Sequence, residues 1–408
     1  MQPWEVAAGI FLVTYTGVAL GSIPGLALDR TGIALLGAIA MVALGVLDTR
    51  ESFSAIHTPT ILLLYSLMVL SAQFRLGGFY THTVLGIVGF LKKPKLFLLV
   101  LMAVSALLSS VLANDIVCLA FTPVVCVAVL RASLNPIPFL IGMACASNLG
   151  SAATIIGNPQ NMLIGQLGQL DFGPFVVWCA PPSIVSVLMA YLVLLGLYRG
   201  KWTQEAPAAI PQDGWPSYDR HQSRKGLLLT LILVAMFFTP VPRELTAISV
   251  AGVVLLSRRF KTRAILGLVD WHLITLFCAL FIVVEGVIRY GIAQKAVLLL
   301  AARGFDLDDP WVLTAVTAGL SNIVSNVPAV MLLLRNVDLH DTVNLYLLAL
   351  ISTYAGNLIT IGSIANLITI EGARAYHVEI GFREHARVGV PVTALSILVA
   401  LCWMTMVA

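Results

Sequence analysis

Long apolar segments are the feature that most restricts the fold of this chain. The segments 60–70, 96–108, 175–197 and 227–238 are apolar on every face that a helix would present. Helices of soluble proteins have one apolar stripe and one polar face, whereas helices apolar all round are typical of a lipid environment. Only 11% of the residues are charged, compared with about 25% in soluble domains. The sequence therefore predicts an all-α membrane protein, and its scattered Lys and Arg residues argue against a nucleic-acid partner.

A helix that spans a membrane needs about 20 residues. By this criterion five spans precede the polar stretch 199–225 and five follow it. The predicted spans are 5–22, 31–47, 57–74, 137–165 and 174–198 before this stretch, and 226–240, 246–258, 270–289, 344–370 and 386–407 after it. We therefore predict a first unit at 1–198, a cytoplasmic linker at 199–225 and a second unit at 226–408.

Two further apolar stretches, 96–130 and 305–335, carry polar residues at their middle. Non-helical backbone at membrane depth is tolerated only where it is buried in protein or lines a water-filled cavity. We therefore predict that both stretches are re-entrant hairpins, which enter and leave on the same side. With the linker in the cytoplasm, this layout places 18 of the 24 Lys and Arg residues on the cytoplasmic side, as the positive-inside rule requires.

The two units are similar to each other in sequence. Segments 106–114 and 318–326 align at an offset of 212 residues, and segments 156–164 and 361–369 align at an offset of 205. Because each unit has five spans and a hairpin that returns to its own side, the second copy would be inverted. We predict two inverted-topology repeats of five transmembrane helices and one re-entrant hairpin each, an architecture common in secondary transporters.

Polar residues cluster at the two hairpin tips and where Gly and Pro interrupt the helices over 137–165 and 344–370. Helices that end at the midplane present free N–H and carbonyl groups to a small polar or ionic substrate. Single Ser, Thr and Asn residues also pack membrane helices together, but their grouping favours a binding site. The predicted substrate-binding residues are Asn114, Ser147, Asn148, Ser151, Asn158, Asn161, Asn322, Ser325, Asn326, Asn357, Thr360, Ser363 and Asn366.

Two acidic residues, Asp115 and Glu285, are predicted to lie deep in the membrane. A carboxylate at the bilayer centre costs about 2.5–3.5 kcal/mol or more, and by default it marks a proton or cation pathway. No Lys or Arg lies near Asp115 in the sequence, so we predict that Asp115 carries the coupling proton or cation. Arg289 follows Glu285 by four residues, so Glu285 is either a second coupling residue or the partner of Arg289 on one helix face.

Four segments carry a resemblance to a known family: SSVLANDIVCLAFTPVV, SNLGSAATIIGNPQNMLIG, SNIVSNVPAVMLLL and GNLITIGSIANLI. They resemble the signature segments of the ion transporter superfamily, which includes ArsB-type arsenite efflux pumps, NhaD-type sodium/proton antiporters, and citrate and dicarboxylate carriers. The closest resemblance is to ArsB-like arsenite and anion permeases. In ArsB-type pumps a similar hairpin carries an Asn-Asp pair, which corresponds to Asn114 and Asp115 here. The resemblance covers both repeats and implies secondary transport.

The charges of the polar segments favour one class of substrate. No Lys or Arg occurs in these segments, and an ionised Asp115 would repel an anion. A neutral hydroxylated solute such as As(OH)3 can instead hydrogen-bond with Asn, Ser and Thr side chains. We therefore predict proton-coupled efflux of arsenite or antimonite across the inner (plasma) membrane. The alternatives are a sodium- or proton-coupled carrier of carboxylates or sulfate, or a sodium/proton antiporter.

Other functions and partners receive less support from the sequence. It contains no HExxH, GxGD or DDxxD pattern, which argues against an intramembrane enzyme. The six cysteines lack CxxC spacing, so we expect no disulfide framework and no metal site. No cofactor is expected, and the sequence leaves open both a homodimer and an ATPase partner.

Overall fold

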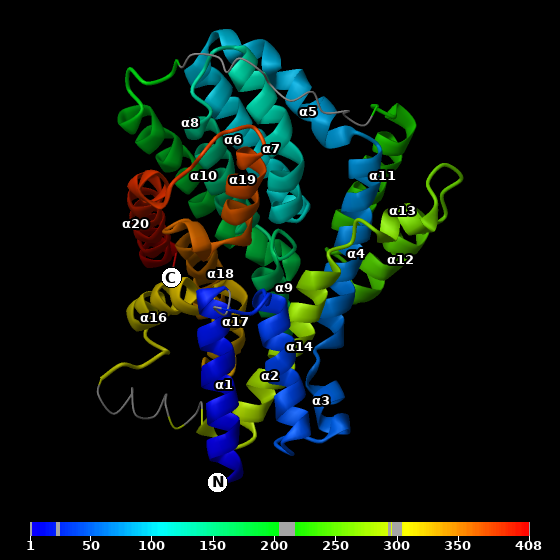
Figure 1. Cartoon of the computed structure of the whole chain (residues 1–408), viewed down its shortest axis with the longest axis vertical. Coiled ribbons are helices and arrows are strands. Elements are labelled where there is room, and N and C mark those ends of the chain that lie inside the picture. Colours follow the sequence, from blue (N-terminus) through cyan, green and yellow to red (C-terminus); the bar gives the residue numbers. More distant parts are fainter. Residues whose placement is uncertain (1, 22–24, 204–216, 293–294, 296–303, 408) are drawn as a thin grey trace.

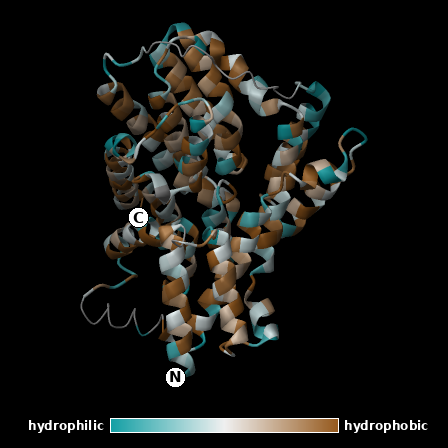
Figure 2. Cartoon of the chain, viewed as in Figure 1, coloured by the Kyte–Doolittle hydropathy of each residue, from teal (hydrophilic) through white to brown (hydrophobic). Residues whose placement is uncertain are grey.

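The computed structural model describes residues 2–21, 25–203, 217–292, 295 and 304–407. These residues are largely helical and contain no β-strand; an isolated bridge joins Leu134 to Thr203. Most of the long helices run roughly along the long axis of the molecule (Figure 1). Figure 2 shows hydrophobic residues along the helices, while hydrophilic residues gather on loops and helix ends. This is the distribution expected of helices that lie in lipid.

The helices of the two predicted units follow one another with short connections. The first unit contains α1 (Pro3–Leu20), α2 (Arg30–Ala43), α3 (Thr49–Ala55), α4 (Thr58–Leu76), α5 (Phe79–Ile87), the 3-10 helix η1 (Val88–Lys92), α6 (Pro94–Val111), α7 (Asn114–Arg131), α8 (Ile137–Ser151), α9 (Pro159–Leu167) and α10 (Phe172–Leu197). The second contains α11 (Arg220–Met236), α12 (Arg243–Leu255), α13 (Thr262–Leu266), α14 (Trp271–Ile288), α16 (Pro310–Val324), α17 (Asn326–Leu333), α18 (Thr342–Ala355), the 3-10 helix η2 (Thr360–Gly362), α19 (Ile364–Arg374) and α20 (Phe382–Val407).

Seven helices in the described part of the chain are long and apolar enough to cross a membrane: α1, α4, α6, α7, α10, α14 and α20. Four shorter apolar helices, α2, α8, α16 and α18, accompany them. The two arms of the first predicted hairpin, α6 and α7, each have 18 residues. Each arm is therefore long enough to cross the membrane completely. That the hairpin enters and leaves on the same side stays a prediction.

The helix predicted over 137–165 is interrupted between Ser151 and Pro159. The side chain of Asn158 accepts a hydrogen bond at 2.9 Å from the backbone N–H three residues on, and so caps α9. Proline is favoured at the first position of a helix, where no N–H is needed. A Cβ atom on Gly157 would overlap the backbone of Ser151, so the chain doubles back too closely for any other residue. The helix therefore ends in the middle of an apolar segment.

The second unit has a similar interruption. Helix α18 ends at Ala355, and α19 begins at Ile364 after the short helix η2. The hydroxyl of Ser363 caps α19, because it accepts a hydrogen bond from the N–H of Ala365 at 3.2 Å. The first interruption is buried throughout, whereas residues 358–360 of the second are only half-buried. Two pairs of half-length helices therefore end inside the protein.

The halves of the molecule pack against each other through matching pairs of helices. Within each half, α6 packs along α8 and α16 packs along α18. Between the halves, α7 contacts α19 and α9 contacts α17, while α2 packs on α14 and α4 packs on α12. Helices α10 and α20 also pack together. The interrupted helices therefore lie between the two halves.

Close packing of α6 on α8 depends on Gly150. A Cβ atom at this position would overlap the backbone of Ala106, which cannot move as a flexible side-chain end could. We expect Gly150→Ala to destabilise the protein by about 1–3 kcal/mol, the usual cost of overpacking. Gly252→Ala in α12 is the matched control, because nothing lies within 4 Å of its Cβ position. Thermal unfolding of both variants in detergent checks this, and equal melting temperatures would contradict it.

The predicted linker over 199–225 is only partly described, since residues 204–216 lie outside the described residues. Its end is helical, because α11 begins at Arg220. The reason is the side chain of Asp219, which accepts hydrogen bonds from two backbone N–H groups of the first turn, at 3.0 and 3.1 Å. The linker prediction therefore included the first turns of a helix.

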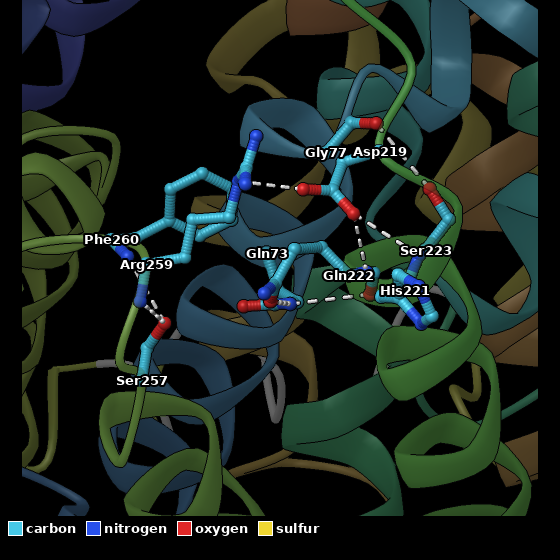
Figure 3. Close-up of polar contacts among 9 residues, drawn as sticks. All are labelled: Gln73, Gly77, Asp219, His221, Gln222, Ser223, Ser257, Arg259 and Phe260. Carbon is cyan, nitrogen blue, oxygen red and sulfur yellow. Dashed lines mark hydrogen bonds and ion pairs between the residues drawn. The ribbon is translucent and has the colours of Figure 1, made fainter.

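The start of α11 is bound to the end of α4 by polar contacts (Figure 3). The backbone N–H of Asp219 donates to the carbonyl of Gly77 at 2.9 Å, and Nε2 of Gln73 donates to Oε1 of Gln222 at 2.7 Å. The Asp219 carboxylate also pairs with Arg259 at 2.7 Å. The two predicted units are therefore joined by side chains as well as by the linker.

Candidate functional site

The first hairpin tip meets the first helix interruption at Asn114, the residue that begins α7. The side-chain Nδ2 of Asn114 donates to Oδ1 of Asn148 at 3.0 Å, and its backbone N–H donates to the carbonyl of Gly157 at 3.4 Å. The hydroxyl of Ser147 donates to the Asn114 carbonyl at 3.2 Å and hydrogen-bonds with the hydroxyl of Ser109 at 2.6 Å. The tip is therefore fixed to the end of α8.

Asn148 connects the two halves of the molecule. Its Nδ2 donates to Oδ1 of Asn357 at 2.8 Å and to Oδ1 of Asn366 at 3.3 Å. Its Oδ1 accepts a hydrogen bond from the hydroxyl of Ser363 at 3.0 Å, in addition to the one from Asn114. All five side chains are buried. The interruptions of α8–α9 and α18–α19 therefore meet at one asparagine.

A second group of contacts extends from the first interruption to α18. Nδ2 of Asn158 donates to the hydroxyl of Ser151 at 3.0 Å and to the hydroxyl of Thr353 at 3.2 Å. The Thr353 hydroxyl also accepts a hydrogen bond from Gln160 at 3.2 Å. Nδ2 of Asn161 donates to the carbonyl of residue 154 at 2.9 Å. These contacts hold the unwound segment in one conformation.

The second hairpin tip lies against the second interruption. Nδ2 of Asn322 donates to the carbonyl of Ala355 at 3.1 Å. A Cβ atom on Gly356 would approach Nδ2 of Asn326 to 2.9 Å, and one on Gly362 would approach Oδ1 of Asn322 to 3.1 Å. The two glycines therefore leave room for the two asparagine side chains of the tip.

Most of the predicted substrate-binding residues therefore come together. A continuous hydrogen-bond network joins nine of them: Asn114, Ser147, Asn148, Ser151, Asn158, Asn161, Asn357, Ser363 and Asn366. Asn322 and Asn326 lie beside it at the glycines of the second interruption. The side chains of Ser325 and Thr360 have no hydrogen bond among the described residues and are only half-buried.

Ser325 has an unusual backbone. Its φ of 76° and ψ of 158° fall in a region that is almost restricted to glycine. Ser325 is the single residue between α16 and α17, where the chain must reverse direction. A conformation of this kind costs about 1–3 kcal/mol and persists only when its surroundings enforce it. The second tip is therefore strained.

The site has more unpaired acceptors than unpaired donors. Among the described residues, no donor lies within hydrogen-bond distance of the buried amide oxygens of Asn114, Asn161, Asn322 and Asn326. The buried amide nitrogen of Asn357 and the buried hydroxyl of Ser321 likewise have no partner. Because an unpaired buried polar atom costs about 1–3 kcal/mol, a ligand that donates hydrogen bonds or carries positive charge would be stabilised here.

Four helices begin at the site, namely α7, α9, α17 and α19. Helix N-termini attract anions, but the side chains of Asn158 and Ser363 already cap α9 and α19. Asp115 stands in the first turn of α7 and opposes its positive end. Only α17 begins with neither a side-chain cap nor an acidic residue in its first turn. Of the four helix N-termini, only that of α17 is therefore available to an anion, whereas four buried amide oxygens are available to a hydrogen-bond donor.

Asp115 is the second residue of α7, directly after Asn114. Its side chain is half-buried and has no hydrogen bond or ion pair among the described residues. A carboxylate in this position has no countercharge to stabilise it in a membrane. Asp115 therefore lies beside the network, and its role in carrying a proton or cation stays a prediction.

The alternative partner predicted for Glu285 is wrong. Glu285 pairs with Arg335 at 3.6 Å, whereas Arg289 pairs with Glu51. Glu285 lies on α14, and Arg335 follows the end of α17. The sequence suggested Arg289 because it is four residues away on the same helix, but a cation from another element lies closer.

Glu285 and Arg335 line a cavity of about 470 Å³. His57, Leu163 of α9 and Met331 of α17 are also in its walls. Helices α9 and α17 begin at the asparagine network, so this cavity lies farther along the two helices that start at the candidate site. None of the network residues lines it.

Three contributors to the network were not predicted: Ser109, Gln160 and Thr353. Thr353 accepts hydrogen bonds from two predicted residues. The offset of 205 residues that aligns the two interruptions places Thr353 opposite Asn148. This offset was a signal that could have identified Thr353. Arg335 was also missed, because nothing in the sequence places it near Glu285.

A family model described as citrate transporter (CitMHS) matches residues 12–339. The chain is 25% identical to the putative transporter arsB of Dictyostelium discoideum, over 96% of this chain and 89% of that protein. It is 29% identical to the uncharacterized transporter Rv2684 of Mycobacterium tuberculosis, over 98% of this chain and 97% of that protein. It is 26% identical to the silicon efflux transporter LSI3 of Oryza sativa subsp. japonica, over 96% of each.

Two solved structures share the fold. The YdaH transporter of Alcanivorax borkumensis has a TM-score of 0.57 and 14% identity, with 100% of this chain and 98% of that chain covered. MtrF of Neisseria gonorrhoeae has a TM-score of 0.58 and 13% identity, with 100% and 95% covered. Both are similar to this chain along its whole length.

Proposed function

The chain belongs to the citrate transporter family and is a multi-pass membrane transporter, and we propose that it exports arsenite or antimonite across the inner membrane in exchange for protons. The asparagine network binds the neutral acid, Asp115 carries the proton, and the site opens alternately to the two sides. The observation that supports this proposal is the excess of unpaired buried amide oxygens in the network and at the second tip beside it. Neutral hydroxylated acids donate hydrogen bonds to such oxygens, whereas carboxylates only accept them.

The contacts between helices support alternating access through an inverted repeat. In the predicted repeat, α2, α4, α7 and α9 are equivalent to α12, α14, α17 and α19. The contact between α7 and α19 is then equivalent to the contact between α17 and α9, and the contact between α2 and α14 is equivalent to that between α12 and α4. Both equivalent pairs are present. In transporters built from inverted repeats, the two halves exchange their conformations as the site changes sides. Two of the similar proteins are named as a putative arsB transporter and a silicon efflux transporter.

A second candidate is transport of a carboxylate anion such as citrate. The description of the family favours it, and so does the uncapped N-terminus of α17 at the site. Against it stands Asp115, which would repel an anion when ionised.

A ligand screen on the purified protein distinguishes the two candidates. A ligand that binds only the folded state raises its melting temperature. We expect arsenite, antimonite and silicic acid to raise the melting temperature near neutral pH, and citrate, succinate and sulfate to leave it unchanged. Asn326→Ala at the second tip should remove the arsenite effect. Asn344→Ala replaces a buried asparagine in α18 that lies outside both the network and the second tip, and it should keep the effect. Stabilisation by citrate alone would instead support the second candidate.

The pair of Glu285 and Arg335 gives a further prediction. Their side chains are 31% and 43% exposed, so the pair contributes at most about 1 kcal/mol to stability. We expect Glu285→Gln to retain pH-driven transport in proteoliposomes. Arg335→Glu should impair transport, because two like charges then meet at the cavity, and the exchange Glu285→Arg with Arg335→Glu should restore it. Loss of proton coupling in Glu285→Gln would make Glu285 a coupling residue instead.

A further inference from the structure

An apolar groove of about 300 Å³ lies between α5–η1 and the last turns of α7. Leu85, Val88 and Leu91 form one wall, and Val124, Ala128 and Arg131 form the other. In Figure 1, α5 slopes from the upper end of α4 toward the upper ends of α6 and α7. The groove therefore lies near one end of the helices, where a membrane protein meets the lipid headgroups.

The walls of the groove extend into exposed apolar side chains. Leu85 is 52% exposed, Phe90 43% and Leu96 37%. An amphipathic segment that crosses the ends of membrane helices places such side chains among the upper parts of the acyl chains. The groove therefore opens onto an apolar part of the surface.

One exposed cation lines the groove, and three more follow its wall in the sequence. Lys92 follows the groove-lining residue Leu91 directly, Lys93 precedes α6, Lys95 is the second residue of α6, and Arg131 lines the groove itself. Asp115, at the opposite end of α7, is the only acidic residue between positions 52 and 170. The segments that form the groove therefore present positive charge without a neighbouring acid in the sequence.

Other apolar grooves lack this combination. The grooves between α1 and α2, and beside α6, α8 and α10, have no charged residue in their linings. Ordinary lipid contact explains those grooves. The groove at α7 offers apolar walls for an acyl chain and cations for a phosphate.

We propose that this groove is a binding site for an anionic phospholipid. One acyl chain lies between α5–η1 and α7, and the phosphate is bound by Arg131, which can donate two parallel hydrogen bonds to it. Lys92, Lys93 and Lys95 attract the negative headgroup. A zwitterionic lipid would gain less from these four cations, so phosphatidylglycerol is preferred over phosphatidylcholine.

Native mass spectrometry of the full-length protein, with either lipid added to the detergent, tests the charge requirement. We expect the wild type to retain phosphatidylglycerol in preference to phosphatidylcholine. Replacing Lys92, Lys93, Lys95 and Arg131 by Gln should lower this retention by at least about tenfold, because each juxtamembrane cation adds to the attraction. The matched control replaces four other exposed cations by Gln, namely Arg220, Arg258, Lys261 and Arg263, and should behave as the wild type.

Variants that change the groove but keep the cations distinguish a lipid bound in the groove from a general attraction of anionic lipid to a basic surface. Ala128→Phe fills the groove and leaves all four cations in place, and Leu85→Gln makes an exposed wall polar with little risk to folding. We expect both to lose the bound phosphatidylglycerol. Full retention in Leu85→Gln and Ala128→Phe would overturn the groove as the site. Equal losses in the two four-cation variants would overturn the role of these particular cations.

Discussion

Asp115→Asn abolishes pH-driven export of arsenite and leaves the protein folded: this is the largest functional effect that we expect from one substitution. Asparagine has nearly the shape of aspartate but cannot carry a proton. The Asp115 side chain has no hydrogen bond or ion pair among the described residues, so the replacement removes no stabilising contact. It also removes a charge that is costly at membrane depth.

The measurement is export from proteoliposomes under an imposed pH gradient, with the melting temperature as the test of folding. The shift in melting temperature on adding arsenite should persist, because the asparagine network remains. Glu379→Gln, which neutralises an exposed acid after α19, is the matched control and should export normally. Proton-driven export that continues in Asp115→Asn would remove Asp115 from the coupling mechanism.

Asn148→Ala should produce the largest loss of stability among the network residues. The side chain of Asn148 makes hydrogen bonds with Asn114, Asn357, Ser363 and Asn366. Alanine leaves several of these buried partners unpaired, at about 1–3 kcal/mol each, so we expect a total loss of at least about 3 kcal/mol. Thermal unfolding of the purified protein measures this.

A comparison with Asn344→Ala makes this expectation specific. Asn344 is as deeply buried as Asn148, but its amide makes one hydrogen bond, to the carbonyl of Asp308 at 2.9 Å. Its replacement should therefore cost less. If both variants lost the same stability, Asn148 would be an ordinary buried asparagine rather than the connection between the halves.

The apolar segments predicted most of the long helices because length and all-round hydrophobicity are properties of the local sequence. The grouping of Asn114, Asn148 and Asn366 was also predictable, since buried amides in an apolar chain must find polar partners. Which partner each one finds depends on how distant helices pack. For that reason Arg335 could not be predicted as the partner of Glu285, and the sequence offered only the local candidate Arg289 for a structural pair.

The start of α11 shows the same limit at a smaller scale. The stretch before it is polar, so the sequence predicted a linker up to residue 225. Asp219 nevertheless begins a helix there, because its carboxylate caps the first turn and also pairs with Arg259. The ion pair is a tertiary contact, and periodicity alone does not reveal it.

The strained backbone at Ser325 has a consequence for the symmetry of the site. The offset of 212 residues places Ala113 opposite Ser325, and Ala113 has an ordinary φ of −50°. The two predicted repeats therefore differ in backbone conformation at this aligned position. In the proposed alternating-access cycle, two identical halves would make the inward-open and outward-open states equivalent by a two-fold rotation and equal in population. A difference at one residue is enough to give the empty transporter a preferred resting side.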